Sequence, residues 1–230
     1  MKVAAILLFG AYTLALAEDA PKMMTHLTVK LESPEIPKDS FAAQAKRIYR
    51  AGSRYCRVEE NPDLEHGIHG LMIINEPDVW MINRLDKTAK HIVDAGPTYN
   101  CRLPMFVNGE DVKSAEDVKK PLMELEFGQE MEYFKPRSAA PHPGPVLQGK
   151  STMVYATQAG DSQLFLFTTG DPEVPVAVVR KNDKTREILW YGEYTQIPFD
   201  AKLFAKPEGV KNRGAKALAQ RVPLPSVAAQ

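Results

Sequence analysis

Apolar and polar residues alternate along several short segments of this chain, and turn-forming residues separate the segments. In residues 23–33, Leu27, Val29 and Leu31 fall on one face and polar residues on the other, which is the pattern of a half-buried strand. Similar patterns predict strands over 41–50, 54–59, 70–75, 79–83, 88–94, 151–158, 164–169, 175–181 and 186–194. Short polar turns between such segments favour a mainly β fold built as an antiparallel meander.

The triplet Asp-Lys-Thr occurs twice, at residues 86–88 and at residues 183–185, each time between two apolar segments. The Asp side chain supports a tight turn, Lys stays solvated, and Thr suits the start of the next strand. We therefore interpret the two triplets as the ends of two hairpins, and not as a repeated active-site motif.

Residues 109–127 depart from the alternation. Ser114 and the acidic residues after it are typical of the start of a helix, and apolar residues follow at helical spacing. We expect one short helix that ends before Gly128, a further strand over 129–135, and a proline-rich loop over 136–149.

The first 17 residues have the pattern of a secretory signal peptide. Lys2 precedes an apolar run, and Ala15 and Ala17 supply the small residues of a cleavage site. The run is too short for a good membrane-spanning helix, so we expect cleavage and not an uncleaved anchor. The mature chain is then expected to be exported, with the periplasm as its location.

The length of the chain limits the number of domains, and its charge limits the classes of binding partner that we expect. Residues 18–209 suit a single domain, and residues 210–230, basic and then rich in Ala and Pro, are expected to form a loosely ordered tail. The chain has 29 basic and 29 acidic residues, and they are interspersed. This balance gives no reason to expect nucleic acid or an acidic membrane as a partner.

Two cysteines, Cys56 and Cys101, lie in the mature chain. An even number of cysteines in an exported protein favours a disulfide bond. The bond would close a loop of 46 residues, from 56 to 101 inclusive, and would contribute about 4 kcal/mol in the chain-entropy model. Two free buried thiols are the alternative.

Residues that could support metal chemistry or catalysis are few. His66 and His69 have a spacing that could hold a metal, but no third ligand can be identified, so a surface loop is favoured over a metal site. The chain has no Gly-x-Ser-x-Gly, no phosphate-binding loop and no Gly-x-Gly-x-x-Gly. We expect a protein that is not an enzyme and needs no cofactor.

Two pieces of the sequence resemble the LolA/LolB-like superfamily of outer-membrane lipoprotein carriers. One is the hairpin VWMIN…DKT…HIVD over residues 79–94. The other is the C-terminal pattern Asp-x-x-Leu-Phe-x-x-Pro-x-Gly, which is formed here by Asp200, Leu203, Phe204, Pro207 and Gly209. The resemblance implies an incomplete β-barrel, that is, a curved antiparallel sheet with short helices covering an apolar concave face. In the carriers this face holds acyl chains.

The apolar strand residues are the candidates for such a binding face. They are Trp80, Ile82, Phe165, Phe167, Val178, Trp190 and Tyr194. Ordinary core packing would use the same residues, because the pattern is identical for a cavity and for a filled core. Our leading hypothesis is a carrier or binding protein for a lipid, an acylated protein or another hydrophobic ligand. The alternative is an interaction or scaffold module with a filled core, which binds another envelope protein.

Overall fold

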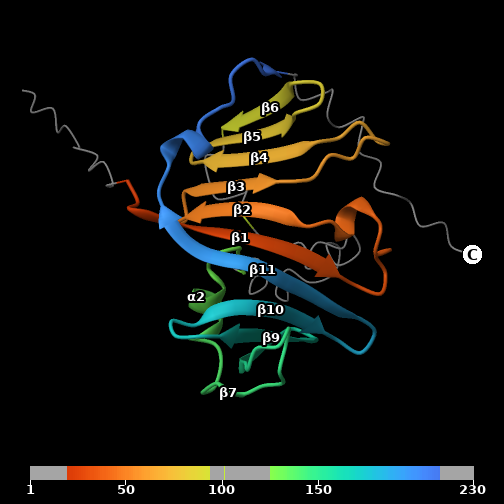
Figure 1. The fold of residues 1–230 in the computed structure, drawn as a ribbon, viewed down its shortest axis with the longest axis vertical. Helices are drawn as coiled ribbons and strands as arrows, with labels where there is room; N and C mark the ends of the chain where they lie inside the picture. The colour runs from red at the N-terminus through yellow and green to blue at the C-terminus, as the bar shows by residue number, and fades with distance from the viewer. Residues whose placement is uncertain (1–19, 94–100, 102–124, 213–230) are drawn as a thin grey trace, which may run out of the picture.

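The computed structural model describes residues 20–93, 101 and 125–212. Their strands form one sheet in the order β12-β6-β5-β4-β3-β2-β1-β11-β10-β9-β8-β7 (Figure 1). Neighbouring strands are antiparallel, except that β12 runs parallel to β6. Since β12 and β7 stand at the two ends of the order, the sheet is open and does not close into a barrel.

Two meanders, one from each half of the chain, make up the sheet. The first consists of β1 (Met23–Glu32), β2 (Lys46–Ala51), β3 (Tyr55–Glu59), β4 (Gly70–Asn75), β5 (Asp78–Asn83) and β6 (Thr88–Val93). The second consists of β7 (His142–Pro143), β8 (Met153–Ala159), β9 (Ser162–Thr169), β10 (Val174–Lys181) and β11 (Arg186–Pro198), and the short β12 (Lys211–Asn212) follows. The two meanders are joined by the long antiparallel pairing of β1 with β11. The strand order confirms the predicted mainly β fold with an antiparallel meander.

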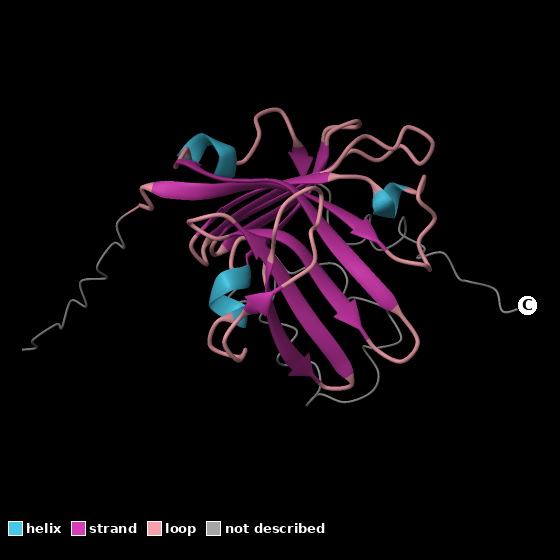
Figure 2. Cartoon of the chain, turned by 60° about the horizontal axis from the view of Figure 1, so that its bottom comes forward, coloured by secondary structure: helices cyan, strands magenta, loops and turns pink. Residues whose placement is uncertain are grey.

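The sheet curves toward one of its faces, which we call the inner face. The buried residues of this face form a single cluster, although Ile74 comes from β4 and Leu164 from β9, near opposite ends of the sheet. The buried residues of the other, outer face separate into two clusters, one over β1–β6 and one over β9–β11. One shared cluster on one face and two on the other are the result of bending, which Figure 2 shows from the side.

Helices are short in the described residues. The inner face carries α2 (Glu130–Phe134), whose Tyr133 and Phe134 belong to the inner cluster. The other two are 3-10 turns, η1 (Phe41–Ala43) and η3 (Ala201–Phe204). The helix expected after Ser114 falls in residues 102–124, outside the described residues, so a helical cover over the concave face stays a prediction.

The strand predicted over 129–135 is wrong, because α2 occupies this position. Glu130, Tyr133 and Phe134 are all buried, and they stand at positions i, i+3 and i+4 of one helical face. A strand would turn Tyr133 and Phe134 to opposite sides. Burial of both rings on the inner face therefore favours a helical turn over the strand propensity of these aromatic residues.

Both Asp-Lys-Thr triplets connect paired strands, β5 to β6 and β10 to β11, which confirms the hairpin interpretation. In the first turn Asp86 Oδ1 accepts a hydrogen bond of 3.1 Å from the backbone N–H of Thr88. In the second turn the accepting side chain is Asn182, which receives bonds from the N–H groups of Lys184 and Thr185. The expected role of Asp therefore holds only for the first turn.

Cys56 and Cys101 form a disulfide bond, as expected. Both are buried in the inner cluster, and the carbonyl oxygen of Cys101 accepts a hydrogen bond of 2.8 Å from the N–H of Phe127. The bond thus attaches β3 to the chain that leads to α2, on the inner side of the sheet.

The C-terminal pattern from Asp200 to Gly209 lies on the outer face. Asp200 Oδ1 accepts the N–H of Lys202 at 2.9 Å and caps η3. Phe204 is buried in the outer cluster over β1–β6, and Leu203 packs against it. Gly209 has a φ of +72°, a conformation that suits glycine. The pattern therefore encodes a turn that covers the outer face.

Candidate functional site: a groove beside Trp190

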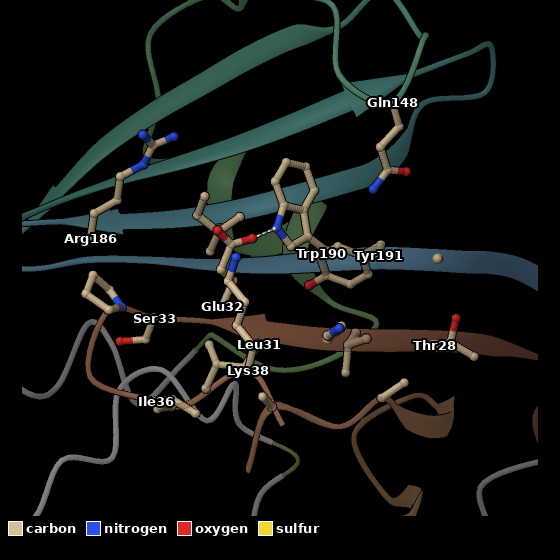
Figure 3. Close-up of a pocket in the computed structure, with 17 residues that line it drawn as sticks. Thr28, Leu31, Glu32, Ser33, Ile36, Lys38, Gln148, Arg186, Trp190 and Tyr191 are labelled. Carbon is tan, nitrogen blue, oxygen red and sulfur yellow. Dashed lines mark hydrogen bonds between the residues drawn. The ribbon is translucent and has the colours of Figure 1, made fainter. Parts of the chain in front are cut away.

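A groove opens where β1 loses its partner β2. Pairing of the two strands ends at Val29 and Lys46, whereas β1 continues to Glu32. The chain between the strands turns away there, and a groove of about 720 Å³ lies between this connection, β1 and β11 (Figure 3). This volume falls within the roughly 300–1,000 Å³ that is usual for ligand pockets.

The groove has an apolar interior and a polar margin. Its apolar lining residues are Val29, Leu31, Pro34, Ile36, Ala43, Ala45, Ile188, Trp190 and Tyr191. Charged residues from β1, β11 and the connection also line it, namely Lys30, Glu32, Lys38 and Arg186. Figure 3 shows Trp190 between Arg186 and Gln148, a residue of the loop before β8. The arrangement suits a molecule with an apolar body and a polar end.

Trp190 is the largest side chain of the groove, and it is fixed at two points. Its Nε1 donates a hydrogen bond of 2.9 Å to Oε2 of Glu32, across the β1–β11 pair. Its ring packs against the outer cluster of Ala177, Val179 and Ile188. An indole that is held in this way offers a rigid apolar surface with little entropy left to lose on binding.

Behind the groove, on the inner side of β11, lies a buried carboxyl group. The Glu130 side chain of α2 is fully buried. Its Oε1 accepts hydrogen bonds from the Tyr191 hydroxyl at 2.7 Å and the Gly128 N–H at 3.0 Å, and its Oε2 accepts the Tyr194 hydroxyl at 3.0 Å. Burial raises the pKa of Glu130, although these three donors favour the charged form.

A β-bulge brings the two tyrosines to the same carboxyl group. Tyr191 pairs with Val29 and Glu193 with the adjacent Thr28, so Gly192 is an extra residue in β11. Without it, simple alternation would place Tyr191 and Tyr194 on opposite faces. A Cβ atom on Gly192 would lie 2.8 Å from Oγ1 of Thr28, which explains the glycine at this position.

The predicted binding residues do not meet at one place. Phe165, Phe167 and Trp190 lie in the outer cluster over β9–β11, Trp80 and Ile82 in the outer cluster over β1–β6, and Val178 and Tyr194 at the inner cluster. Of the seven, Trp190 lines the groove. The prediction missed Ile36, Ala45 and Gln148, because they belong to connecting segments with no periodic pattern to mark them.

The pair His66 and His69 does not converge on a metal site in the described part of the chain. His66 Nδ1 lies 2.8 Å from Oδ2 of Asp63, and the backbone N–H of His69 donates to Oδ1 of Asn83 at 3.0 Å. Within residues 20–93, 101 and 125–212, no group of three or more His, Cys, Asp or Glu residues is placed to hold a metal ion. Over the same residues, no helix is long and apolar enough to span a membrane.

The fold and the groove define a mainly β protein with one open, curved sheet and a groove on that sheet. No family model and no curated protein matches the sequence. Among solved structures, the chain is similar to an uncharacterised conserved protein from Thermus thermophilus, at 13% identity over 84% of this chain and 91% of that one, with a TM-score of 0.45. It is also similar to LprF from Mycobacterium bovis, at 9% identity over 75% and 85% of the two chains, with a TM-score of 0.39. Likenesses of this size define neither a family nor a ligand for this chain.

Proposed function

We propose that this chain is an exported, non-catalytic binding protein for a hydrophobic ligand, and a distant member of the LolA/LolB-like superfamily. The observation that carries the proposal is the groove of about 720 Å³ beside Trp190, with its apolar interior and charged margin. The ligand is an amphiphile, such as a lipid or the acyl chains of an acylated protein. Its chain lies along Trp190 and Ile188, and its polar end meets Lys30, Lys38 or Arg186.

Binding in the groove is driven by burial of the chain, at roughly 0.8 kcal/mol for each CH₂ group removed from water. On the described inner face, Leu27, Ile48, Leu166 and Leu189 are fully buried in the inner cluster. We place the ligand in the groove, which is lined by Val29, Leu31 and Tyr191 of the inner cluster together with Ile188 and Trp190 of the outer face, and not in the space between the sheet and α2. No bond of the ligand is made or broken in this role.

Two tryptophan substitutions provide the test. Ala45 is exposed and lines the groove, whereas Ala42 is exposed three residues earlier and does not line it. Ala45→Trp fills part of the groove and is expected to weaken uptake of a fluorescent long-chain fatty acid about tenfold, the equivalent of two CH₂ groups left in water. Ala42→Trp is expected to bind like the parent protein.

A second test examines which molecules remain bound to the parent protein when it is purified from its native envelope. Mass spectrometry of the extract is expected to detect acyl species that Ala45→Trp retains less well. If the parent protein carries no acyl species and takes up no fatty acid, or if both variants bind equally well, the proposal is overturned.

The buried inner cluster also supports the second candidate, an envelope interaction or scaffold module, because its side chains pack on one another. In that role the loop from Pro141 to Pro145 contacts another envelope protein. Cross-linking pull-down then recovers a partner that is lost on substitution of this loop and kept in Ala45→Trp. If the protein is instead a carrier for a hydrophobic ligand, Ala45→Trp impairs its function and substitution of the loop does not.

A further inference from the structure

A second pocket, of about 330 Å³, lies on the outer face between β3–β5 and the chain that follows η3. Five basic residues from separate parts of the sequence line it: Arg57, Arg84, Lys87, Lys202 and Lys206. The lining includes one acidic residue, Glu208. A concentration of one charge around a concave surface strengthens the local field and attracts ions of the opposite sign.

The carboxyl group of Glu59 compensates part of this positive charge. Oε1 of Glu59 accepts hydrogen bonds from Nε of Arg57 at 2.6 Å and from Nη2 of Arg84 at 3.1 Å. Burial raises the pKa of Glu59, but the two guanidinium groups lower it more, so it stays below the ordinary value and the carboxyl group is ionised. Glu59 is shared further with Arg47, whose Nη1 lies 3.6 Å from its Oε2. Among the described residues, Glu59 and Glu208 therefore do not balance the five cations of the pocket.

The walls of the pocket are held in place by the backbone. Nη1 of Arg57 donates a hydrogen bond of 2.8 Å to the carbonyl oxygen of Leu203. The N–H of Lys211 donates one of 2.8 Å to the carbonyl oxygen of Lys87. The buried side chains of Leu71 and Ile82 form apolar lining beneath. A ligand therefore meets cations whose supporting chain is already ordered, which lowers the entropy cost of binding.

We propose that this pocket binds a phosphate group, either free or at the head of a phospholipid. Arginine and lysine are the side chains that recognise phosphate, through multiple charged hydrogen bonds and through point charge respectively. The apolar lining can accept the carbon atoms next to a head-group phosphate. Among the described residues, the pocket and the groove beside Trp190 have no lining residue in common. This proposal can therefore be tested independently of the proposed function.

The test uses the full mature chain and three probes: inorganic phosphate, vesicles of phosphatidylcholine with phosphatidylglycerol, and vesicles of phosphatidylcholine alone. The pocket variant is Lys87→Gln/Lys202→Gln/Lys206→Gln. The control variant is Lys150→Gln/Lys181→Gln/Lys184→Gln, which removes the same charge from exposed lysines outside the pocket. Binding is measured by calorimetry for phosphate and by co-sedimentation for vesicles, at low and at high salt.

We expect the pocket variant to bind the responsive probe about a hundredfold more weakly than the parent protein, and the control variant to change little. A response to phosphate alone identifies a free phosphate as the ligand, and a response to the anionic vesicles identifies a lipid head group. Equal losses in the two variants would show general charge attraction and overturn the proposal. Absence of binding to both phosphate and anionic vesicles at low salt would also overturn it.

Discussion

The hydroxyl group of Tyr191 lies 2.7 Å from Oε1 of Glu130, and this hydrogen bond connects the strand beneath the groove to the helix on the inner face. Both side chains are buried. Burial raises the pKa of Tyr191 well above its ordinary value, and the nearby carboxyl group of Glu130 raises it further. The Tyr191 hydroxyl therefore keeps its proton, and remains a hydrogen-bond donor, at neutral pH.

Removal of this donor is expected to destabilise the fold. Tyr191→Phe leaves Oε1 of Glu130 with one donor fewer in a site that water does not reach, and the free energy of unfolding should fall by about 1–3 kcal/mol. Chemical denaturation measures the change. Tyr49→Phe is the control, since the half-buried Tyr49 stacks its ring on His26 and should lose less. Equal losses in the two variants would contradict the importance of the Glu130 contact.

The stability of the protein should depend on pH through Glu130. Because burial raises the pKa of this group in the folded protein above its ordinary value of 4.5, the folded state holds the proton more tightly than the unfolded state does. Its contribution to stability is complete below pH 4.5 and is lost as the pH rises through the folded pKa.

Glu130→Gln isolates this effect, because glutamine has a similar size and does not titrate. The difference in unfolding free energy, parent minus variant, should fall as the pH rises above 4.5 and then level off. Denaturation curves for both proteins over a series of pH values provide the measurement. A difference that stays constant, or that rises with pH, would show that the pKa of Glu130 is not raised.

The disulfide bond should supply a large part of the stability. It links residues 45 positions apart, so its loss should reduce the free energy of unfolding by about 4 kcal/mol in the chain-entropy model. Cys56→Ala/Cys101→Ala tests this, and a reducing agent should destabilise the parent protein by a similar amount. The double variant should not respond to the reducing agent. If it is as stable as the oxidised parent, the predicted contribution is wrong.

Most strands could be predicted from sequence because their alternation is local. Leu27, Val29 and Leu31 were expected on one face, and all three lie in the inner cluster. The segment at α2 was missed because its helical face includes Glu130, a carboxylate that does not count as apolar in a pattern. Its burial depends on hydroxyl groups of Tyr191 and Tyr194 that come from about 60 residues later.

The binding surfaces depend on contacts that local patterns do not contain. The groove combines β1, the connection after it and β11, so Trp190 was identified but Ile36 was not. The basic pocket combines Arg57, Lys87 and Lys206 from three separate segments. The chain has a formal net charge of +0, and for this reason the composition alone did not indicate an anionic partner.

The most direct test of the central claim, that an apolar chain lies beside Trp190, uses the two tryptophans of the sequence. Trp80→Phe leaves Trp190 as the only indole, and Trp190→Phe leaves Trp80, which lies in a different cluster of the outer face. The probe is an uncharged long-chain alcohol with bromine atoms on its chain, because bromine quenches tryptophan fluorescence at contact and the basic pocket does not attract a neutral molecule. The unbrominated alcohol is the control.

We predict a saturable loss of fluorescence in Trp80→Phe and little loss in Trp190→Phe. Equal quenching in the two variants, or no quenching of Trp190 at any concentration of the soluble alcohol, would contradict the binding site proposed here.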